Sequence, residues 1–184
     1  MEEHKIRYKF IGDMSVFSEE LRGKISRVEE LSKNYERLLN IALNYGSRAE
    51  MVQAFNLLAA EGKKVISEED ICGALYTSHC PDPDIIVRTG GDIRLSNFLL
   101  WQAEYSEFYF TDVLWPDLSN ADVDEIVREF YKRKSKYGKI YGENHVKENY
   151  YLGCRCHDTD TCAVVFGHIS FCRSNVACIL RGVL

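Results

Sequence analysis

The sequence has 184 residues, and 23 lysines and arginines against 28 aspartates and glutamates give a net charge of −5 at pH 7. Hydrophobic residues make up 46% of the chain and aromatic residues 12%, which suffices for a packed core and excludes wholesale disorder. An isoelectric point near 5.6 excludes a basic nucleic-acid-binding protein. The length predicts one domain of about 150 residues, or one domain and a tail.

The amino terminus is acidic and polar, without the positive start and apolar stretch of a secretory signal. No apolar run approaches the roughly 18 residues that cross a bilayer. We therefore expect a cytoplasmic protein with at most a peripheral membrane association. The seven cysteines are an odd number in a chain without an export signal, so we expect reduced thiols and not a disulfide framework.

The first half of the chain alternates strand and helix patterns. Residues 6–10 alternate apolar and basic side chains, as a strand with one protected face does. Ser18 is placed to cap a helix over about residues 18–35. Residues 38–45 form a nearly continuous apolar run, which is typical of a strand covered on both faces of a parallel sheet.

A second helix is predicted over residues 47–62, because Ser47 and Glu50 have the spacing of a capping box. The residues expected on its buried face are Val52, Phe55, Leu58 and Ala59. A shorter helix is predicted to begin at Ser67, with Ile71 and Leu75 facing inward.

The alternation of strand and helix patterns continues through the next part of the chain. Residues 84–88 indicate a short buried strand, residues 97–102 a helical segment, and residues 105–111 an extended segment. Ser119 or Asn120 is placed to cap a helix that ends before Gly138. This alternation predicts an α/β fold, a parallel sheet with flanking helices.

The loop after residues 84–88 carries the residues of greatest chemical interest. Arg88 and Arg94 flank Gly90-Gly91, and Ser96 follows where a helix is expected to begin. Each guanidinium can fork onto phosphate oxygens, the glycines let backbone N–H groups come close, and a helix start adds partial positive charge. This combination suits a diphosphate, and its place beyond the carboxyl end of a strand suits a ligand. It is neither a Walker loop nor a dinucleotide-binding fingerprint.

The same residues allow a purely structural interpretation. Arg88 and Arg94 would then pair with Asp84 and Asp92, and the glycines would only turn the chain. The residue types by themselves leave both interpretations open.

The sequence closely resembles the cis-prenyltransferase family, the undecaprenyl diphosphate synthases and their archaeal relatives, from about Lys5 to about Gly138. The resemblance is carried by four blocks, which occur in the family's order. They are Phe10–Ser15, Leu39–Arg48, Asp82–Gln102 and Tyr105–Asp117.

The resemblance implies an enzyme that uses Mg²⁺ and condenses isopentenyl diphosphate with an allylic diphosphate into a long cis-polyprenyl diphosphate of the undecaprenyl type. It implies that Arg88, Arg94 and Ser96 hold the diphosphate of isopentenyl diphosphate, with Leu95 between them. It also implies that Glu107 is a Mg²⁺ ligand, and that the chain forms a homodimer or a heteromer.

The sequence departs from the family's pattern at its beginning. The family's Asp-Gly-Asn-x-Arg motif is absent, and Ile93 stands where some members have a histidine, so no catalytic residue is assigned. We therefore expect a chain that lacks the amino-terminal part, an incomplete sheet with exposed edges and apolar faces, and weak or no activity of the chain alone. The alternative is a non-catalytic subunit that binds isopentenyl diphosphate and completes a partner's active site.

The resemblance implies a partial cis-prenyltransferase domain at residues 1–138, followed by an irregular cysteine-rich extension at residues 139–184. The candidate metal ligands in the extension are Cys154, Cys156, His157, Cys162, His168, Cys172 and Cys178. They lack the paired C-x-x-C spacing of strong zinc motifs, so we favour an irregular extension. A metal-binding or interaction protein on an α/β scaffold is the alternative that rests on this segment.

Overall fold

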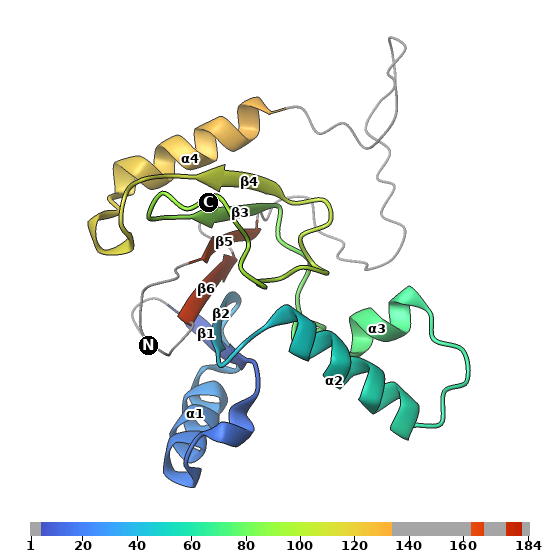
Figure 1. The fold of residues 1–184 in the computed structure, drawn as a ribbon. Helices are drawn as coiled ribbons and strands as arrows, with labels where there is room; N and C mark the ends of the chain where they lie inside the picture. Colours follow the sequence, from blue (N-terminus) through green and yellow to red (C-terminus); the bar gives the residue numbers. More distant parts are fainter. Residues whose placement is uncertain (1–4, 134–162, 168–175, 182–184) are drawn as a thin grey trace, which may run out of the picture.

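A six-stranded sheet in the order β1-β2-β6-β5-β3-β4 is the central layer of the computed structural model, which describes residues 5–133, 163–167 and 176–181 (Figure 1). The strands are β1 (Ile6–Ile11), β2 (Arg37–Leu43), β3 (Ile85–Arg88), β4 (Glu107–Phe110), β5 (Ala163–Gly167) and β6 (Val176–Arg181). β1 is parallel to β2, and β3 is parallel to β4 and β5. β6 runs antiparallel to β2 and β5, so the sheet is mixed and not wholly parallel.

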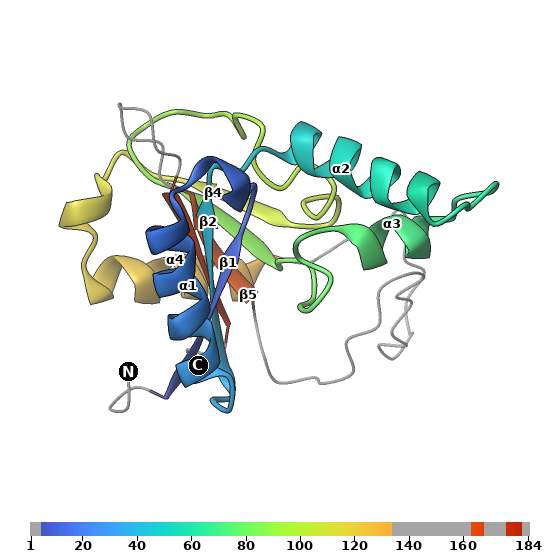
Figure 2. The same cartoon turned by 90° about the horizontal axis from the view of Figure 1, so that it is seen from below.

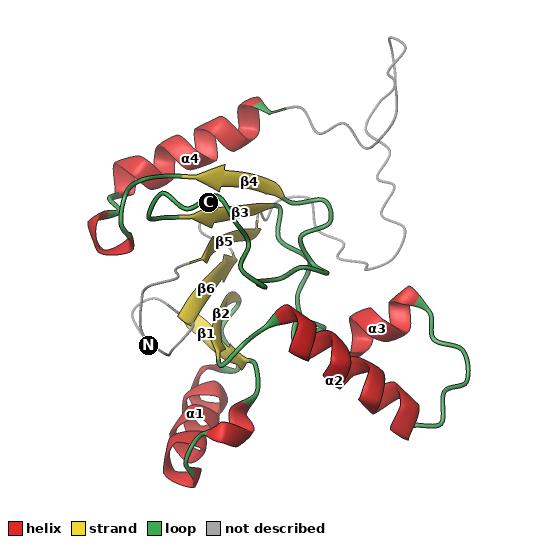
Figure 3. Ribbon diagram, viewed as in Figure 1, coloured by secondary structure: helices red, strands yellow, loops and turns green. Residues whose placement is uncertain are grey.

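Helices lie on both faces of this sheet, as expected for an α/β fold (Figure 3). They are α1 (Glu19–Ser32), α2 (Ser47–Ala60), α3 (Glu68–Ala74) and α4 (Asn120–Lys132), with 3₁₀ turns at Met14–Val16 and Trp115–Asp117. In Figure 2, α1 and α4 lie on one side of the sheet, and α2 and α3 lie on the other. None of the helices in the described residues is long and apolar enough to cross a membrane.

The core forms on both sides of β3, whose four residues are all buried. Ile85 and Val87 pack with Ile126 of α4 on one face. Ile86 packs with Leu99 and other buried residues on the opposite face. The prediction of a short strand covered on both faces is therefore confirmed.

Most of the expected helix starts are also confirmed. Ser18 caps α1 by accepting a hydrogen bond from the Leu21 N–H. Ser67 and Ser119 each form a capping box, with the third helical residue, an aspartate, bonding back to the cap. These starts depend on residues within one turn, which a sequence pattern can indicate.

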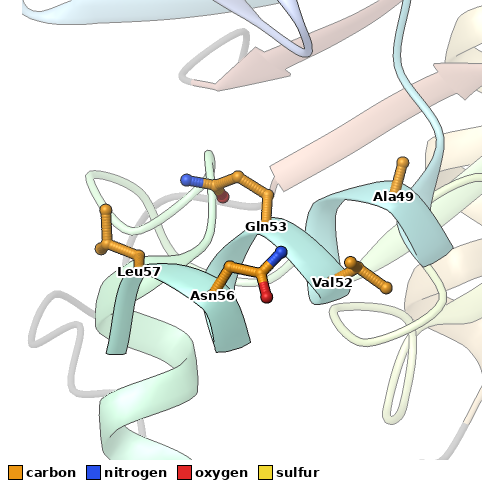
Figure 4. A pocket seen from close by; sticks show the side chains of 5 residues that line it. All are labelled: Ala49, Val52, Gln53, Asn56 and Leu57. Atoms are coloured by element: carbon orange, nitrogen blue, oxygen red, sulfur yellow. The ribbon is translucent and has the colours of Figure 1, made fainter. Parts of the chain in front are cut away.

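The predicted capping box at α2 is wrong, and so is most of the predicted buried face of this helix. Its N-cap is Gly46, and Glu50 is turned into the protein interior. The buried positions are Ser47, Glu50, Ala54 and Leu58, so of the expected residues only Leu58 faces inward. The inward Glu50 sets the rotation of the helix and leaves Val52 and Phe55 60% and 43% exposed. Figure 4 shows Val52, Asn56 and Leu57 in a pocket on this outer side of α2.

The helix predicted at residues 97–102 is also absent, and this segment consists of consecutive turns. Ser96, Asn97 and Leu99 have φ values of +51°, +63° and +47°, in the left-handed region that an α-helix does not use. Ser96 therefore does not lie at a helix start, and no helix dipole strengthens the loop there.

Two strands, β5 and β6, lie in the segment for which we expected an irregular extension. The boundary at residue 138 and the candidate zinc ligands other than Cys178 lie outside the described residues. Within the described residues, no group of three or more histidine, cysteine, aspartate or glutamate side chains is placed to hold a metal ion.

The two outer strands of the sheet are covered by side chains of neighbouring segments. On β1, the Tyr8 N–H donates to Ser32 Oγ at 3.0 Å and the Phe10 N–H donates to Glu29 Oε1 at 2.9 Å. On β4, Arg133 Nη1 donates to the Phe108 carbonyl at 2.8 Å. Backbone groups that point away from the sheet are thus partly satisfied, which limits edge-to-edge association.

Replacing the buried Ser32 with alanine should destabilise the protein by about 1–2 kcal/mol, because the Tyr8 N–H loses its acceptor. Ser26→Ala, at an exposed position of the same helix, is the matched control and should change stability by less than about 0.5 kcal/mol. Urea unfolding of both variants measures the difference. Equal stabilities of the two variants would contradict the proposed covering of the β1 edge.

Candidate functional site

The candidate site lies at the edge of the sheet where parallel strands end. The loop of residues 89–106 leaves β3 there, and α2 begins there after β2. The Asn44 amide donates to the Asp13 carbonyl at 3.1 Å, which joins the ends of β1 and β2. Ligands of α/β sheets bind at this edge, so the fold places the loop where a site is expected.

Arg88, the last residue of β3, is buried beneath this loop with 5% of its surface exposed. Its Nη1 donates to the Arg94 carbonyl at 2.5 Å and to Ser96 Oγ at 3.0 Å. Its Nη2 donates to Asp92 Oδ2 at 2.9 Å. Three contacts from one guanidinium therefore determine how residues 92–96 fold.

Arg94 is the exposed member of the pair, with 61% of its side chain accessible. Its Nη2 donates to the same Asp92 oxygen at 2.5 Å. The structural interpretation of the sequence is thus confirmed for Asp92, which bridges both guanidinium groups. The bridge also brings two arginines together at one point, which is the arrangement that a diphosphate needs.

The two glycines turn the loop against the segment after β4. Gly90 and Gly91 have φ values of +88° and +80°, and a Cβ at Gly91 would lie 2.9 Å from Asp112 Oδ1. Their N–H groups donate to the carbonyls of Val113 at 3.0 Å and Thr111 at 2.9 Å. The N–H groups of these two glycines are therefore already bonded within the protein, and a phosphate would have to use other backbone donors.

Other backbone donors of the loop are free. Within the part of the chain that the structure describes, no group accepts a hydrogen bond from the N–H of Ile93, Arg94, Leu95 or Ser96. Leu95 is half-buried, and its carbonyl accepts from the Phe98 N–H at 3.1 Å. The fold thus places Arg94, Leu95 and Ser96 in one loop over Arg88, and their part in binding a diphosphate stays a prediction.

Glu107 is not brought to this loop. It is the first residue of β4 and lies opposite Ile85, whereas Arg88 lies opposite Phe110. At about 3.3 Å per residue, the two ends of this strand pair are about 10 Å apart. Glu107 Oε2 accepts instead from Arg133 Nη1 at 3.2 Å.

The surroundings of Glu107 do not fit a magnesium site. Mg²⁺ in proteins takes one or two carboxylates together with phosphate oxygens and waters, without a competing cation. Here the one carboxylate is paired with the Arg133 guanidinium, and the described residues form no metal-binding cluster. The assignment of Glu107 as a Mg²⁺ ligand is not tested and stays a prediction, but this arrangement of side chains does not support it.

Sequence reasoning missed the polar network beneath the loop. Glu50 is fully buried and accepts hydrogen bonds from Tyr45 Oη at 2.5 Å, the Tyr76 N–H at 2.8 Å and Gln102 Nε2 at 3.1 Å. Gln102 Nε2 also donates to Thr77 Oγ1 at 2.8 Å. Burial, and secondly the Glu50 carboxylate, raises the pKa of Tyr45 well above its ordinary value, so the phenol keeps its proton.

This network joins the end of β2, α2, the segment after α3 and Gln102 of the loop. The available signal was the spacing of Ser47, Glu50, Ala54 and Leu58, which places all four residues on one helix face. Asn97 was missed as well, and its signal was the turn-forming pair Ser96-Asn97 where a helix was expected.

A protein-family model described as "Putative undecaprenyl diphosphate synthase" matches residues 1–138. An isoprenyl transferase of Fusobacterium nucleatum is 45% identical over 141 residues, covering 76% of this chain and 61% of that protein. An isoprenyl transferase of Rickettsia prowazekii is 43% identical over 140 residues, covering 76% and 62%. The matched residues include the whole candidate loop and end before β5.

Two solved structures share the fold. A probable undecaprenyl diphosphate synthase of Campylobacter jejuni has a TM-score of 0.69 at 34% identity, covering 76% of this chain and 66% of that chain. A lavandulyl diphosphate synthase of Lavandula x intermedia in complex with dimethylallyl diphosphate also has a TM-score of 0.69 at 34% identity, covering 73% and 61%. The chain thus spans between 61% and 62% of the length of the two curated relatives.

Replacing Glu50 with alanine should destabilise the protein by about 3 kcal/mol or more, because two buried donors and one half-buried donor lose their acceptor. Glu125→Ala, at an exposed position of α4, removes the same charge and should have little effect. Chemical denaturation at pH 7 compares the two. A loss below about 1 kcal/mol in Glu50→Ala would show that the network is dispensable.

Proposed function

The chain belongs to the undecaprenyl diphosphate synthase (cis-prenyltransferase) family, and on this premise we propose that its loop after β3 binds the diphosphate of isopentenyl diphosphate for condensation with an allylic diphosphate. The product would be a cis-polyprenyl diphosphate of the undecaprenyl type. The observation that carries the proposal is the pairing of two guanidinium groups, Arg88 and Arg94, at a single carboxylate oxygen.

The charge of the loop supports this ligand. A diphosphate presents several oxygens that can each accept from a guanidinium, and two arginines at one point can hold it from two sides. Asp92 occupies that point in this structure, so a diphosphate that binds both arginines takes the place of its carboxylate. Arg94 should contribute most to the binding free energy, because its guanidinium is exposed and can reach the ligand without unfolding the loop.

The remaining residues of the loop have distinct tasks in this proposal. Ser96 is exposed and its hydroxyl, which already accepts from Arg88, can donate its proton to a phosphate oxygen. The free N–H groups of residues 93–96 add donors at the same place. Leu95 is half-buried and anchors the loop between the two polar ligands. Positioning by such fixed donors is the main contribution a protein makes to diphosphate chemistry.

A second candidate function is a subunit that binds isopentenyl diphosphate and completes a partner's active site in a heteromer. One observation favours it over a transferase that acts alone: the carboxylate of Glu107 is paired with the Arg133 guanidinium and lies about 10 Å along the strand pair from Arg88. The lavandulyl diphosphate synthase holds dimethylallyl diphosphate, and by analogy an allylic diphosphate is the second substrate that we propose for the complete site.

Arg94→Ala should weaken binding of isopentenyl diphosphate by about 2 kcal/mol, or roughly 30-fold, because a charge-assisted contact is lost. Arg128→Ala on α4 removes the same charge from an exposed position and serves as the control. Isothermal titration calorimetry at fixed ionic strength gives the dissociation constant of each variant for isopentenyl diphosphate. Equal affinities of the two variants would refute the assignment of the loop.

Turnover separates the two candidate functions. Labelled isopentenyl diphosphate is incubated with the purified chain, an allylic diphosphate and Mg²⁺, and the label in extracted polyprenyl products is counted. We expect binding with little or no incorporation by the chain alone. Incorporation at the rate of a complete isoprenyl transferase would exclude the subunit hypothesis and leave the transferase.

A further inference from the structure

The start of α2 is capped by a residue that lies 50 positions later in the chain. The first N–H groups of any helix lack partners within the helix, and Gly46 at the N-cap has no side chain to supply one. The Ser47 N–H donates to the Asn97 carbonyl at 2.9 Å, and the Arg48 N–H donates to Asn97 Oδ1 at 2.9 Å. Asn97 therefore performs the N-cap function for α2 from the candidate loop.

The contact between the two segments is reciprocal. Ser47 Oγ accepts from the Leu100 N–H at 3.0 Å, so each segment supplies an acceptor to the other. These bonds surround three non-glycine residues with left-handed φ values, Ser96, Asn97 and Leu99. Such a conformation costs free energy and persists where the surrounding contacts impose it. The bonds to α2, together with the contact of Arg88 with Ser96, hold this conformation here.

The segment with left-handed φ values lies in the same loop as the residues proposed to bind the diphosphate. Asn97 follows Ser96, whose hydroxyl is one of the two acceptors of Arg88 Nη1. Arg88 thus fixes the position of Arg94 through its carbonyl, and the start of α2 fixes the position of Asn97. We propose that Asn97 is a positioning residue, which fixes Ser96 and Arg94 for the diphosphate by capping α2. This inference rests on the function proposed above.

Gly46 provides an independent way to disturb the same contact. A Cβ at this position would lie 2.8 Å from Asn97 Nδ2, which is too close for any real contact. The backbone of Gly46 has a φ of −156°, which any residue adopts, so the space beside Asn97 is the only requirement for glycine. In Gly46→Ala the Asn97 amide must shift away from the added methyl group, which weakens its bond to the Arg48 N–H.

The test compares four full-length chains for their affinity for isopentenyl diphosphate, measured by calorimetry under conditions in which each is folded. They are the unchanged chain, Asn97→Gly, Gly46→Ala and the double variant. Glycine at position 97 keeps the left-handed backbone without strain and removes only the amide. We expect each single variant to bind about 5–10-fold more weakly, because Ser96 and Arg94 lose their fixed positions. The double variant should bind no more weakly than Asn97→Gly, because the amide that clashes with the added methyl group at position 46 is gone.

Several results would overturn the inference. Unchanged affinity in Asn97→Gly, with only a lower free energy of unfolding, would mean that Asn97 has a structural role alone. If the losses of affinity of the two single variants multiply in the double variant, Gly46→Ala does not act through the Asn97 amide, which contradicts the proposed contact. If the unchanged chain binds no isopentenyl diphosphate, the proposed function fails and the inference fails with it. If the unchanged chain binds isopentenyl diphosphate and Arg94→Ala weakens this binding, but Asn97→Gly and Gly46→Ala do not, the proposed function stands and only the inference about Asn97 fails.

Discussion

The buried guanidinium of Arg88 is the interaction on which the candidate site depends. A charged group that is 5% exposed must have acceptors around it, because leaving it unpaired inside a protein would be strongly destabilising. Three acceptors come from residues 92–96, so the loop folds over the end of β3 to supply them. The loop conformation is thus a consequence of placing an arginine at the last position of a buried strand.

The ion pairs of Asp92 show that a structural and a functional interpretation of the same residues need not exclude each other. One carboxylate oxygen holds both arginines and offsets their mutual repulsion while no other anion is present. In the proposed function, a diphosphate would offer the same kind of acceptor with more charge and more oxygens, and would take the place of the carboxylate. Arg88 makes three contacts with the loop and fixes its conformation. Arg94 is exposed, so its side chain is free to adjust its position to a bound anion.

Local patterns predicted much of this molecule, and long-range contacts account for what they missed. Helix starts such as Ser119, whose cap lies within one turn, were predicted correctly. The helix expected at residues 97–102 was wrong because Asn97 bonds to a segment 50 positions earlier, which overrides local propensity. Arg88 and Arg94 were singled out from their motif, and their part in binding stays a prediction. The separation of Glu107 from Arg88 could not be predicted, because it depends on the register of β4 against β3.

The capping of α2 by Asn97 also bears on how the chain folds during synthesis. When the ribosome has released α2 but not yet residues 97–100, the first turn of the helix has neither the Asn97 acceptors nor the contact with Leu100. A 14-residue helix without its cap is only marginally stable in water. We therefore expect α2 to fray in the nascent chain and to become ordered together with the loop, so that helix and loop fold as one cooperative unit.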